Sequence, residues 1–280
     1  VEIDDLRNYW QPGQEGVQQR YVENLWVNNP WLIANENTNS FQSRRYIGNI
    51  KVDYDISKNF SARFRYGADL LDEERAFRRA PSTRGVLLGS YREDEITFSE
   101  TNAEFLLGYN TDRDDYSDFD LDVKVGGNIM RQDGNILVAN NPELENFGTD
   151  ESVYTLTNAR SGVLVESQKT RTGINSLFGT ATFSYLNSLF IDASYRNDWN
   201  STLVNPIAGL EGSEYSFGYP SVAVSAVLSD LFELPEDLSF LKLKGSYAEV
   251  GNGAPPYAFG NTFTPQPAFG SQAIFTTGRT

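Results

Sequence analysis

The chain has 280 residues and a formal net charge of −15, from 23 Lys and Arg against 38 Asp and Glu, with no His. A nucleic-acid partner is disfavoured, because phosphate backbones are bound by clustered Lys and Arg. The absence of His and Cys excludes thiol nucleophiles, histidine bases, zinc fingers, iron–sulfur clusters and disulfides. Aromatic residues make up 13% and are mainly Phe and Tyr, which favours strands.

No apolar run approaches the roughly 20 residues that a membrane-spanning helix needs. Residues 1–5 (VEIDD) have neither the basic start nor the apolar run of a signal peptide, so we expect none in the sequence as it stands.

Alternation of apolar and polar residues with a period of two is the main structural signal. In residues 59–70, Phe60, Phe64 and Leu70 fall on one face, and Arg63 and Arg65 on the other. The same criterion predicts about eight strands. Their approximate ranges are 50–56, 59–70, 95–109, 119–125, 176–185, 189–195, 219–228 and 240–250.

The predicted connections alternate between short and long. Short turns at residues 57–59, 110–115 and 186–188 separate long connections at 71–94, 130–175 and 197–218, with a moderate one at 229–239. Outer-membrane barrels have short periplasmic turns and long extracellular loops, and their strands cross the membrane in about ten residues. We therefore predict an all-β fold, part of a transmembrane antiparallel β-barrel. A soluble β-sandwich gives the same alternation strand by strand and stays an alternative.

Aromatic residues lie where a barrel places its interface girdles. Phe183 and Tyr185 precede a short turn, whereas Tyr195 and Trp199 lie towards the other end of the next strand. We expect these side chains to point outward.

Several ordered segments resemble the barrel of SusC/RagA-type TonB-linked outer-membrane transporters. Residues 175–203 (NSLFGTATFSYLNSLFIDASYRNDWNSTL) carry the resemblance, with YPSV at 219–222, LSD at 228–230 and LSFLKLKGSYAEVGN at 238–252. Earlier segments fit in the same order. These are NPW at 29–31, NEN at 35–37, YIGNI at 46–50, GGN at 126–128 and MR at 130–131.

The resemblance implies a barrel of about 22 strands with an internal plug, of which this chain is a middle segment of about eight. It also implies import of oligosaccharides or peptides across the outer membrane of a Gram-negative bacterium. The implied partners are a SusD-like surface lipoprotein, the TonB complex and outer-membrane lipid. Residues 1–45 are expected to form an entry segment, 46–250 the barrel strands with their long extracellular loops, and 251–280 an extracellular loop. We expect the plug and the TonB box of the family to lie outside this sequence.

Two clusters of acidic residues could indicate metal binding or catalysis. Asp112, Asp114, Asp115 and Asp118 could supply calcium ligands, but Ser117 occupies the position of the EF-hand glycine, and a solvated turn explains the cluster better. Residues 93–95 (EDE) could supply the carboxylate pair of a glycosidase, although such pairs arise by chance in so acidic a chain. We predict no enzyme activity and no catalytic, cofactor-binding or metal-binding residues.

The polar face of the predicted strands offers the best candidates for function. If the apolar face meets lipid, charged residues on the other face point into the lumen, where they can influence passage. The candidates are Arg63, Arg65, Asp192, Arg196 and Asp198. The structural alternative is that they pair with a plug or with one another across strands.

Two other functions stay open at the level of sequence. A soluble β-sandwich that binds carbohydrate would place its aromatic residues in a groove and would fold without detergent. A small self-contained barrel of about eight strands would span the membrane without a plug.

Overall fold

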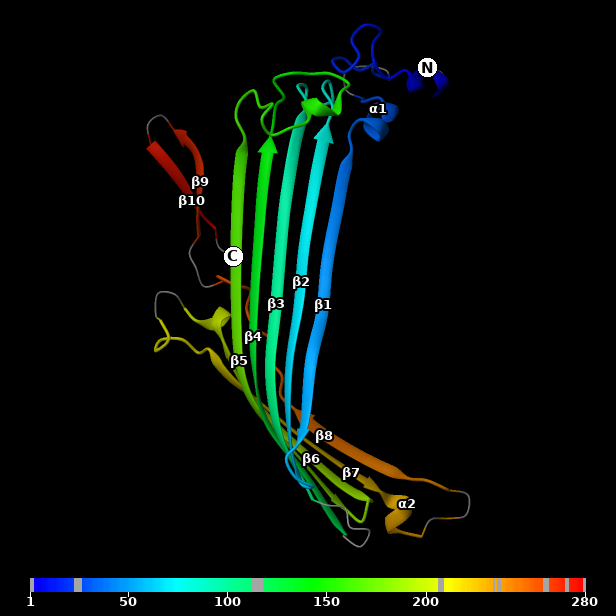
Figure 1. Cartoon of the computed structure of the whole chain (residues 1–280), viewed down its shortest axis with the longest axis vertical. Helices are drawn as coiled ribbons and strands as arrows, with labels where there is room; N and C mark the ends of the chain where they lie inside the picture. The colour runs from blue at the N-terminus through cyan, green and yellow to red at the C-terminus, as the bar shows by residue number, and fades with distance from the viewer. Residues whose placement is uncertain are drawn as a thin grey trace. The chain divides into compact units, whose positions relative to one another are not determined.

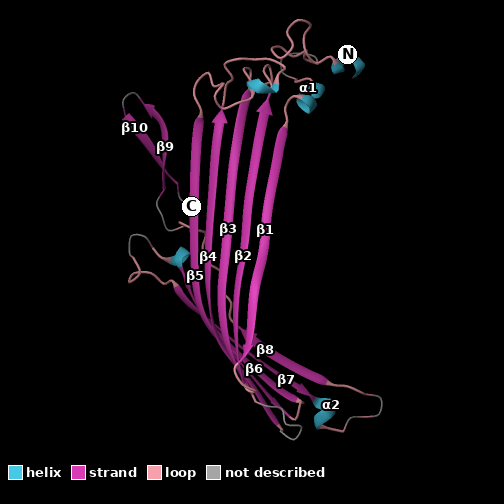
Figure 2. Ribbon diagram, viewed as in Figure 1, coloured by secondary structure: helices cyan, strands magenta, loops and turns pink. Residues whose placement is uncertain are grey.

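Strands dominate the computed structural model of the chain (Figures 1 and 2). It describes residues 3–22, 27–111, 118–205, 209–233, 235, 238–258, 262–269 and 272–278. Ten strands are assigned within these residues. They are β1 (Asn39–Asp55), β2 (Phe60–Arg79), β3 (Ser90–Asn110), β4 (Phe119–Asn141), β5 (Leu164–Tyr185), β6 (Leu189–Asn200), β7 (Ser216–Val227), β8 (Lys242–Ala248), β9 (Thr262–Phe269) and β10 (Gln272–Gly278).

The helices are short and lie between the strands or before them. They are η1 (Ile3–Arg7), α1 (Pro30–Asn35), η2 (Glu151–Val153), η3 (Ser201–Leu203) and α2 (Leu228–Leu231). Within the described residues, none of them has both the length and the apolar character that a membrane crossing requires.

Strands β1 to β8 form one sheet in sequence order, so that each strand pairs with the next (Figure 1). The resolved registers are antiparallel, as in the pairings of Phe183 with Ile191 and of Ile191 with Val224. In the part of the chain that the structure describes, β1 and β8 are the two edges of this sheet. The predicted all-β fold with about eight antiparallel strands is confirmed. An open single sheet is neither a sandwich nor a closed small barrel.

Five strands are much longer than the sequence predicted. β1, β2, β3, β4 and β5 have 17, 20, 21, 23 and 22 residues. The predicted bounds of the loops at residues 71–94 and 130–175 are wrong, because the flanking strands extend further and leave only residues 80–89 and 142–163 between them. Charged residues occupy both faces of β2 after Leu70, and cross-strand ion pairs such as Arg44–Asp72, 3.2 Å apart, stabilise the extended backbone there.

Both ends of the chain also contain more regular structure than predicted. β1 begins at Asn39, within the predicted entry segment, and α1 precedes it. The predicted loop at residues 251–280 contains β9 and β10, which form a separate antiparallel ribbon. The strand predicted at 240–250 is shorter, because β8 covers Lys242–Ala248.

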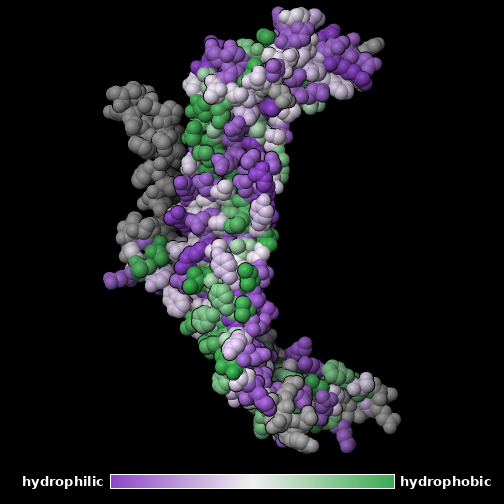
Figure 3. All heavy atoms as spheres, in the orientation of Figure 1, coloured by the Kyte–Doolittle hydropathy of each residue, from purple (hydrophilic) through white to green (hydrophobic). Residues whose placement is uncertain are grey.

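The described chain divides into two compact units. Unit 1 contains Val1–Ile47, Asp69–Ser99 and Asp133–Thr170, and it has an apolar core in which Tyr91 of β3 packs with Leu144 and Tyr154 of the connection between β4 and β5. Fully buried amide side chains connect the N-terminal segment to itself and to the loop between β2 and β3. Gln19 donates to the Ser82 carbonyl oxygen, and Asn29 donates to the carbonyl oxygens of Leu6 and Arg20. The surface of the N-terminal segment is mostly hydrophilic (Figure 3).

Unit 2 contains Gly48–Ala68, Glu100–Gln132 and Arg171–Thr280, and it has almost no apolar interior among its described residues. Its large apolar side chains are exposed instead, with Ile50 at 70% and Tyr54 at 66%. Among the described residues, unit 2 therefore lacks a buried apolar core of the kind that unit 1 has.

Candidate functional site

The two faces of the sheet in unit 2 can be assigned from contacts between neighbouring strands. On β1 and β2, Asp53 contacts Arg63 at 2.5 Å. Arg65, on the same face of β2 as Arg63, contacts Glu104 of β3 at 3.2 Å. Asn110 of β3 donates to Asp122 of β4 at 3.3 Å. These contacts establish one continuous polar face across β1 to β4.

The same face continues across β5 to β7. A Cβ added to Gly126 of β4 would meet the ring of Phe178 on β5 at 2.9 Å, and Phe178 is the register partner of Arg196 on β6. Ser194 of β6 and Ser221 of β7 share a hydrogen bond of 2.6 Å. We call this side of unit 2 the polar face.

The opposite face of unit 2 is apolar and exposed. Its members on β1 to β3 include Ile50, Val52, Tyr54, Phe60, Phe64, Phe105 and Leu107, and those on β4 to β7 include Phe119, Val125, Ile129, Leu177, Ile191, Tyr195, Val222 and Val224. We call this surface the apolar band. On β4 it extends from Phe119 to Ile129, which matches the 9 to 11 residues that a tilted strand needs to cross hydrocarbon.

Aromatic rings gather at the end of the apolar band beside the short turns. The rings of Phe119 and Tyr185 are 4.8 Å apart, and those of Phe60 and Tyr109 are 4.9 Å apart. Tyr195 and Trp199 lie further along β6 on the same face, opposite Gly179 and Asn175. The predicted outward placement of Tyr185 and Tyr195 therefore agrees with the register.

All five residues predicted to influence passage lie on the polar face. Arg196 donates to Asp198 and to Ser176, both at 2.7 Å, and its guanidinium group lies 5.7 Å from the centre of the Phe178 ring. Asp192 accepts a hydrogen bond from Thr182 at 2.8 Å. The candidates therefore form separate polar clusters with neighbouring strands.

The partners of these residues were not predicted from the sequence. Asp53 could have been found, because it and Arg63 are placed symmetrically about the short turn between β1 and β2. Glu104 could not, because its contact with Arg65 depends on the register of β3, which follows a long connection. Ser176 carries no charge that would have singled it out.

A small hollow of about 200 Å³ opens on the polar face near the turn between β1 and β2. Its lining includes Asp53, Asp55, Arg63, Gly108 and Lys124. Gly108 keeps it open, because a Cβ there would meet the Ser61 hydroxyl oxygen at 2.8 Å. The hollow has room for one polar side chain or a small polar group.

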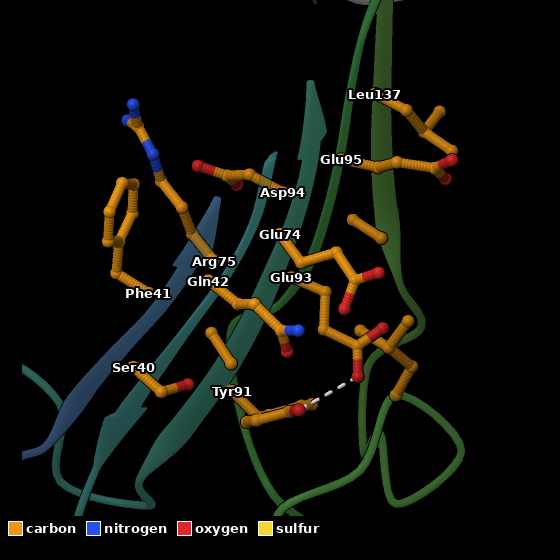
Figure 4. A pocket seen from close by; sticks show the side chains of 13 residues that line it. Ser40, Phe41, Gln42, Glu74, Arg75, Tyr91, Glu93, Asp94, Glu95 and Leu137 are labelled. Carbon is orange, nitrogen blue, oxygen red and sulfur yellow. Dashed lines mark hydrogen bonds between the residues drawn. The ribbon is translucent and has the colours of Figure 1, made fainter. Parts of the chain in front are cut away.

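Unit 1 contains a larger cavity of about 680 Å³ (Figure 4). Gln42, Glu74 and Glu93 point to one side of the strands, whereas Arg75 and Asp94 point to the other. The Tyr91 hydroxyl donates to Glu93 at 2.8 Å. Burial, together with this hydrogen bond, raises the pKa of Tyr91 to about 12.

The two sequence hypotheses on acidic residues have different outcomes. Asp94 is buried and forms a two-point ion pair with Arg92, at 2.6 and 2.8 Å, on the side away from Glu93. Residues 93–95 therefore do not converge on one point. The calcium hypothesis concerns Asp112, Asp114 and Asp115, which lie outside the described residues, and Asp118, which is exposed. Across the described part of the chain, no three acidic side chains cluster closely enough to hold a metal ion.

The chain matches no known family profile and no curated protein sequence. It is similar in structure to a solved RagAB peptide transporter, with a TM-score of 0.72 and 19% sequence identity over 91% of this chain. Two structures of the RagAB peptide importer give TM-scores of 0.71, one in a closed-closed state at 18% identity over 90% of the chain, and one in an open-open state at 18% over 95%.

This chain spans only 27 to 29% of the length of those transporter chains. At this identity the similarity establishes the fold. The sheet of eight antiparallel strands is the fold of part of a RagA-like β-barrel, and the resemblance noted in the sequence is confirmed at that level.

Proposed function

We propose that this chain forms part of the barrel wall of a SusC/RagA-type transporter that imports nutrients across the outer membrane. The observation that carries the proposal is the continuous, exposed apolar band of unit 2, backed by a polar face on the same strands. A sheet of this kind is stable when lipid covers the band and the polar face lines a lumen, as in outer-membrane barrels. The similarity to the RagAB transporters supports this arrangement.

The proposed role of the polar face is to bind and guide cargo without changing its covalent bonds. Arg63, Arg65, Asp192, Arg196 and Asp198 supply charged groups there, and we propose them as residues of the substrate path. The Arg196 guanidinium group is held by Asp198, Ser176 and the Phe178 ring, so it can meet a passing carboxylate or hydroxyl group without reorganising first.

The cargo class is proposed as oligosaccharides or peptides. The solved structures that resemble this chain are of peptide transporters, which supports peptides. Cations lie over aromatic rings in unit 2, with Arg196 5.7 Å from the centre of Phe178 and Lys242 5.4 Å from that of Phe190. A ring face covered by a cation offers less area to a sugar, which also favours peptide cargo.

The proposed partners are a SusD-like surface lipoprotein at the end of the long connections, and the TonB complex acting through a plug. We place the long connections within residues 46–250 on the extracellular side and the short turns on the periplasmic side, as in other outer-membrane barrels. Residues 1–45 and 251–280 would then belong to that same side, and the host would be a Gram-negative bacterium.

The test is to isolate the protein that carries this chain from outer membranes in mild detergent and to identify what accompanies it by mass spectrometry. The proposal expects a membrane-fraction protein with a surface lipoprotein and bound peptides or glycans. Arg196→Gln should slow uptake of that cargo, whereas Lys58→Gln, in a short turn, serves as the matched control. A protein that stays soluble without detergent would contradict the proposal.

A further inference from the structure

Three planar side chains form a row across the polar face of unit 2. Phe178 of β5 is the register partner of Arg196 on β6, and Arg196 is the register partner of Tyr219 on β7. Partners on adjacent strands point to the same face of a sheet, so the three side chains lie side by side. The row lies towards the end of β6 from which the long connection to β7 leaves. In the proposed orientation this is the extracellular end, where cargo arrives.

Both rings of the row lie down along the sheet, because each has a glycine on the segment beside it. A Cβ added to Gly126 of β4 would lie 2.9 Å from Cζ of Phe178, and one added to Gly251 would lie 3.0 Å from Cε1 of Tyr219. The tip of each ring therefore occupies space that a side chain of the neighbouring segment would fill. Adjacent strands are about 4.8 Å apart, so a ring that reaches across this distance turns one face away from the sheet.

The guanidinium group of Arg196 lies between these rings and is held in place. Its Nε donates to Asp198 and its Nη2 donates to Ser176, both at 2.7 Å, and its carbon atom lies 5.7 Å from the centre of the Phe178 ring. Phe178, Arg196 and Tyr219 are each half-buried, as expected for planar groups that pack one side on the sheet and leave the other side free. The row is therefore formed before any cargo arrives.

The chemistry of the row suits an aromatic group better than an anion or a sugar. Asp198 balances the charge of Arg196, because Nε of the arginine and the carboxylate oxygen are 2.7 Å apart. The guanidinium group then contributes chiefly a flat surface, which stacks well on an aromatic face. A sugar ring has no such face. The Nη1 donors are not used in the contacts with Asp198 and Ser176, so they can serve a peptide oxygen beside the ring.

We propose that Phe178, Arg196 and Tyr219 form a subsite for one aromatic side chain of a peptide cargo, and that Tyr219 determines this preference. The inference rests on the proposed function, because it requires the polar face to line the path of the cargo. The guanidinium group already covers part of the Phe178 ring, which leaves Tyr219 as the main stacking surface.

The test compares two pentapeptides, each of four glycines around a central residue that is phenylalanine in one and leucine in the other. Calorimetry measures their dissociation constants with the full-length protein in mild detergent, and thermal unfolding of each variant is followed separately. We expect the phenylalanine peptide to bind roughly fivefold more tightly. Tyr219→Leu fills the same space without an aromatic ring and should abolish this preference, whereas Tyr219→Phe restores a ring and should keep it.

The matched control is Tyr247→Leu. Tyr247 of β8 is the register partner of Val222, so its ring lies on the face of the apolar band. This variant should keep the fivefold preference of the unaltered protein. Loss of the preference in Tyr247→Leu would overturn the subsite, because an effect from the opposite face is not stacking on the cargo.

Each other outcome has a definite meaning. A purely structural role of Tyr219 changes both affinities by the same factor, so an unchanged preference in Tyr219→Leu would overturn the subsite and leave the transporter proposal standing. Equal binding of the two peptides by the unaltered protein would do the same. Competition by a malto-oligosaccharide that is lost in Tyr219→Leu would overturn the aromatic cargo, because the row would then bind sugar. A protein that binds neither peptide nor sugar and stays soluble without detergent would overturn the transporter proposal together with the subsite.

Discussion

Units 1 and 2 share the same long strands, but the buried apolar side chains lie almost entirely in unit 1. In unit 1, Leu32 and Leu144 are completely buried, and polar groups such as Gln19 and Asn29 are buried with hydrogen-bond partners. Strand residues of both units have exposed apolar side chains, such as Ile47 at 71% and Ile50 at 70%, but among the described residues of unit 2 only Val227 is a buried apolar residue. Burying apolar surface is the main favourable term for a protein in water, so water favours the core of unit 1, whereas the exposed apolar band of unit 2 fits the proposed lipid surroundings.

The largest expected effect comes from placing a charge in the middle of the apolar band. Val125 lies midway between Phe119 and Ile129 on β4 and is 49% exposed. Val125→Arg should destabilise the bilayer-inserted protein by about 2–4 kcal/mol, measured as its free energy of unfolding from lipid vesicles. The control is Val17→Arg in unit 1, where Val17 is 47% exposed. This substitution should change the free energy of unfolding by less than about 0.5 kcal/mol. An equal loss of unfolding free energy in Val125→Arg and Val17→Arg would contradict the proposed lipid contact of the apolar band.

The second prediction concerns close packing in unit 1. Gly13 and Gly16 both have positive φ, at 77° and 75°, but only Gly16 is crowded, because a Cβ there would clash with the backbone of Gly148. Gly16→Ala should therefore cost about 1–3 kcal/mol more than Gly13→Ala. Thermal unfolding of the two variants measures the difference. Equal melting temperatures would show that this segment does not pack on Gly148.

The third prediction concerns the buried amides of unit 1. Asn29 accepts a hydrogen bond from the Trp31 backbone N–H, so it caps α1, and it donates to two carbonyl oxygens. Asn29→Ala should destabilise this region by about 1–2 kcal/mol, seen as faster amide hydrogen exchange in residues 3–22 and 30–35. Asn35→Ala removes an exposed amide at the end of the same helix and is the control. Unchanged exchange in Asn29→Ala would contradict the expected role of this side chain.

The smallest expected effect is a dependence on pH. Burial and the hydrogen bond to Glu93 raise the pKa of Tyr91 from about 10 to about 12, so the folded state holds this proton more tightly than the unfolded state does. The stability that Tyr91 contributes is complete below pH 10 and is lost as the pH rises towards 12. The phenolate absorbance of the native protein minus that of Tyr91→Phe reports the titration. Ionisation of Tyr91 near pH 10 would contradict the raised pKa.

Much of unit 2 could be predicted from sequence, because its signal is local. The alternation at Phe60, Phe64 and Leu70 places the start of β2, and residues 186–188 form the predicted turn between β5 and β6. Both depend on neighbouring residues alone. Even the polar-face position of Arg63 and Arg196 follows from the period of two.

Unit 1 was harder to predict, because its structure depends on distant contacts. The second half of β2 alternates poorly, and Asp72 is held by Arg44 on the preceding strand. The conformation of the loop after β2 depends on a residue far away in the sequence, because Gln19 donates a hydrogen bond to the backbone carbonyl oxygen of Ser82, 63 residues later. Ser82 itself adopts a φ of 66°, which its own sequence neighbours do not predict. In unit 2, the strand β9 was missed for a different reason, because Pro265 and Pro267 have no backbone N–H to donate within a sheet. The two prolines are two residues apart, so both missing donors fall on the same edge of the strand.

The central claim is that lipid covers the apolar band and water reaches the polar face. The chain contains no cysteine, so single labels can be introduced on adjacent residues of one strand. Fluorescent labels at Val125→Cys and Lys124→Cys in the protein reconstituted into vesicles would be exposed in turn to brominated lipid and to iodide. We expect the lipid quencher to reach the label at 125 and iodide to reach the label at 124. Equal quenching of both labels by iodide would contradict the claim.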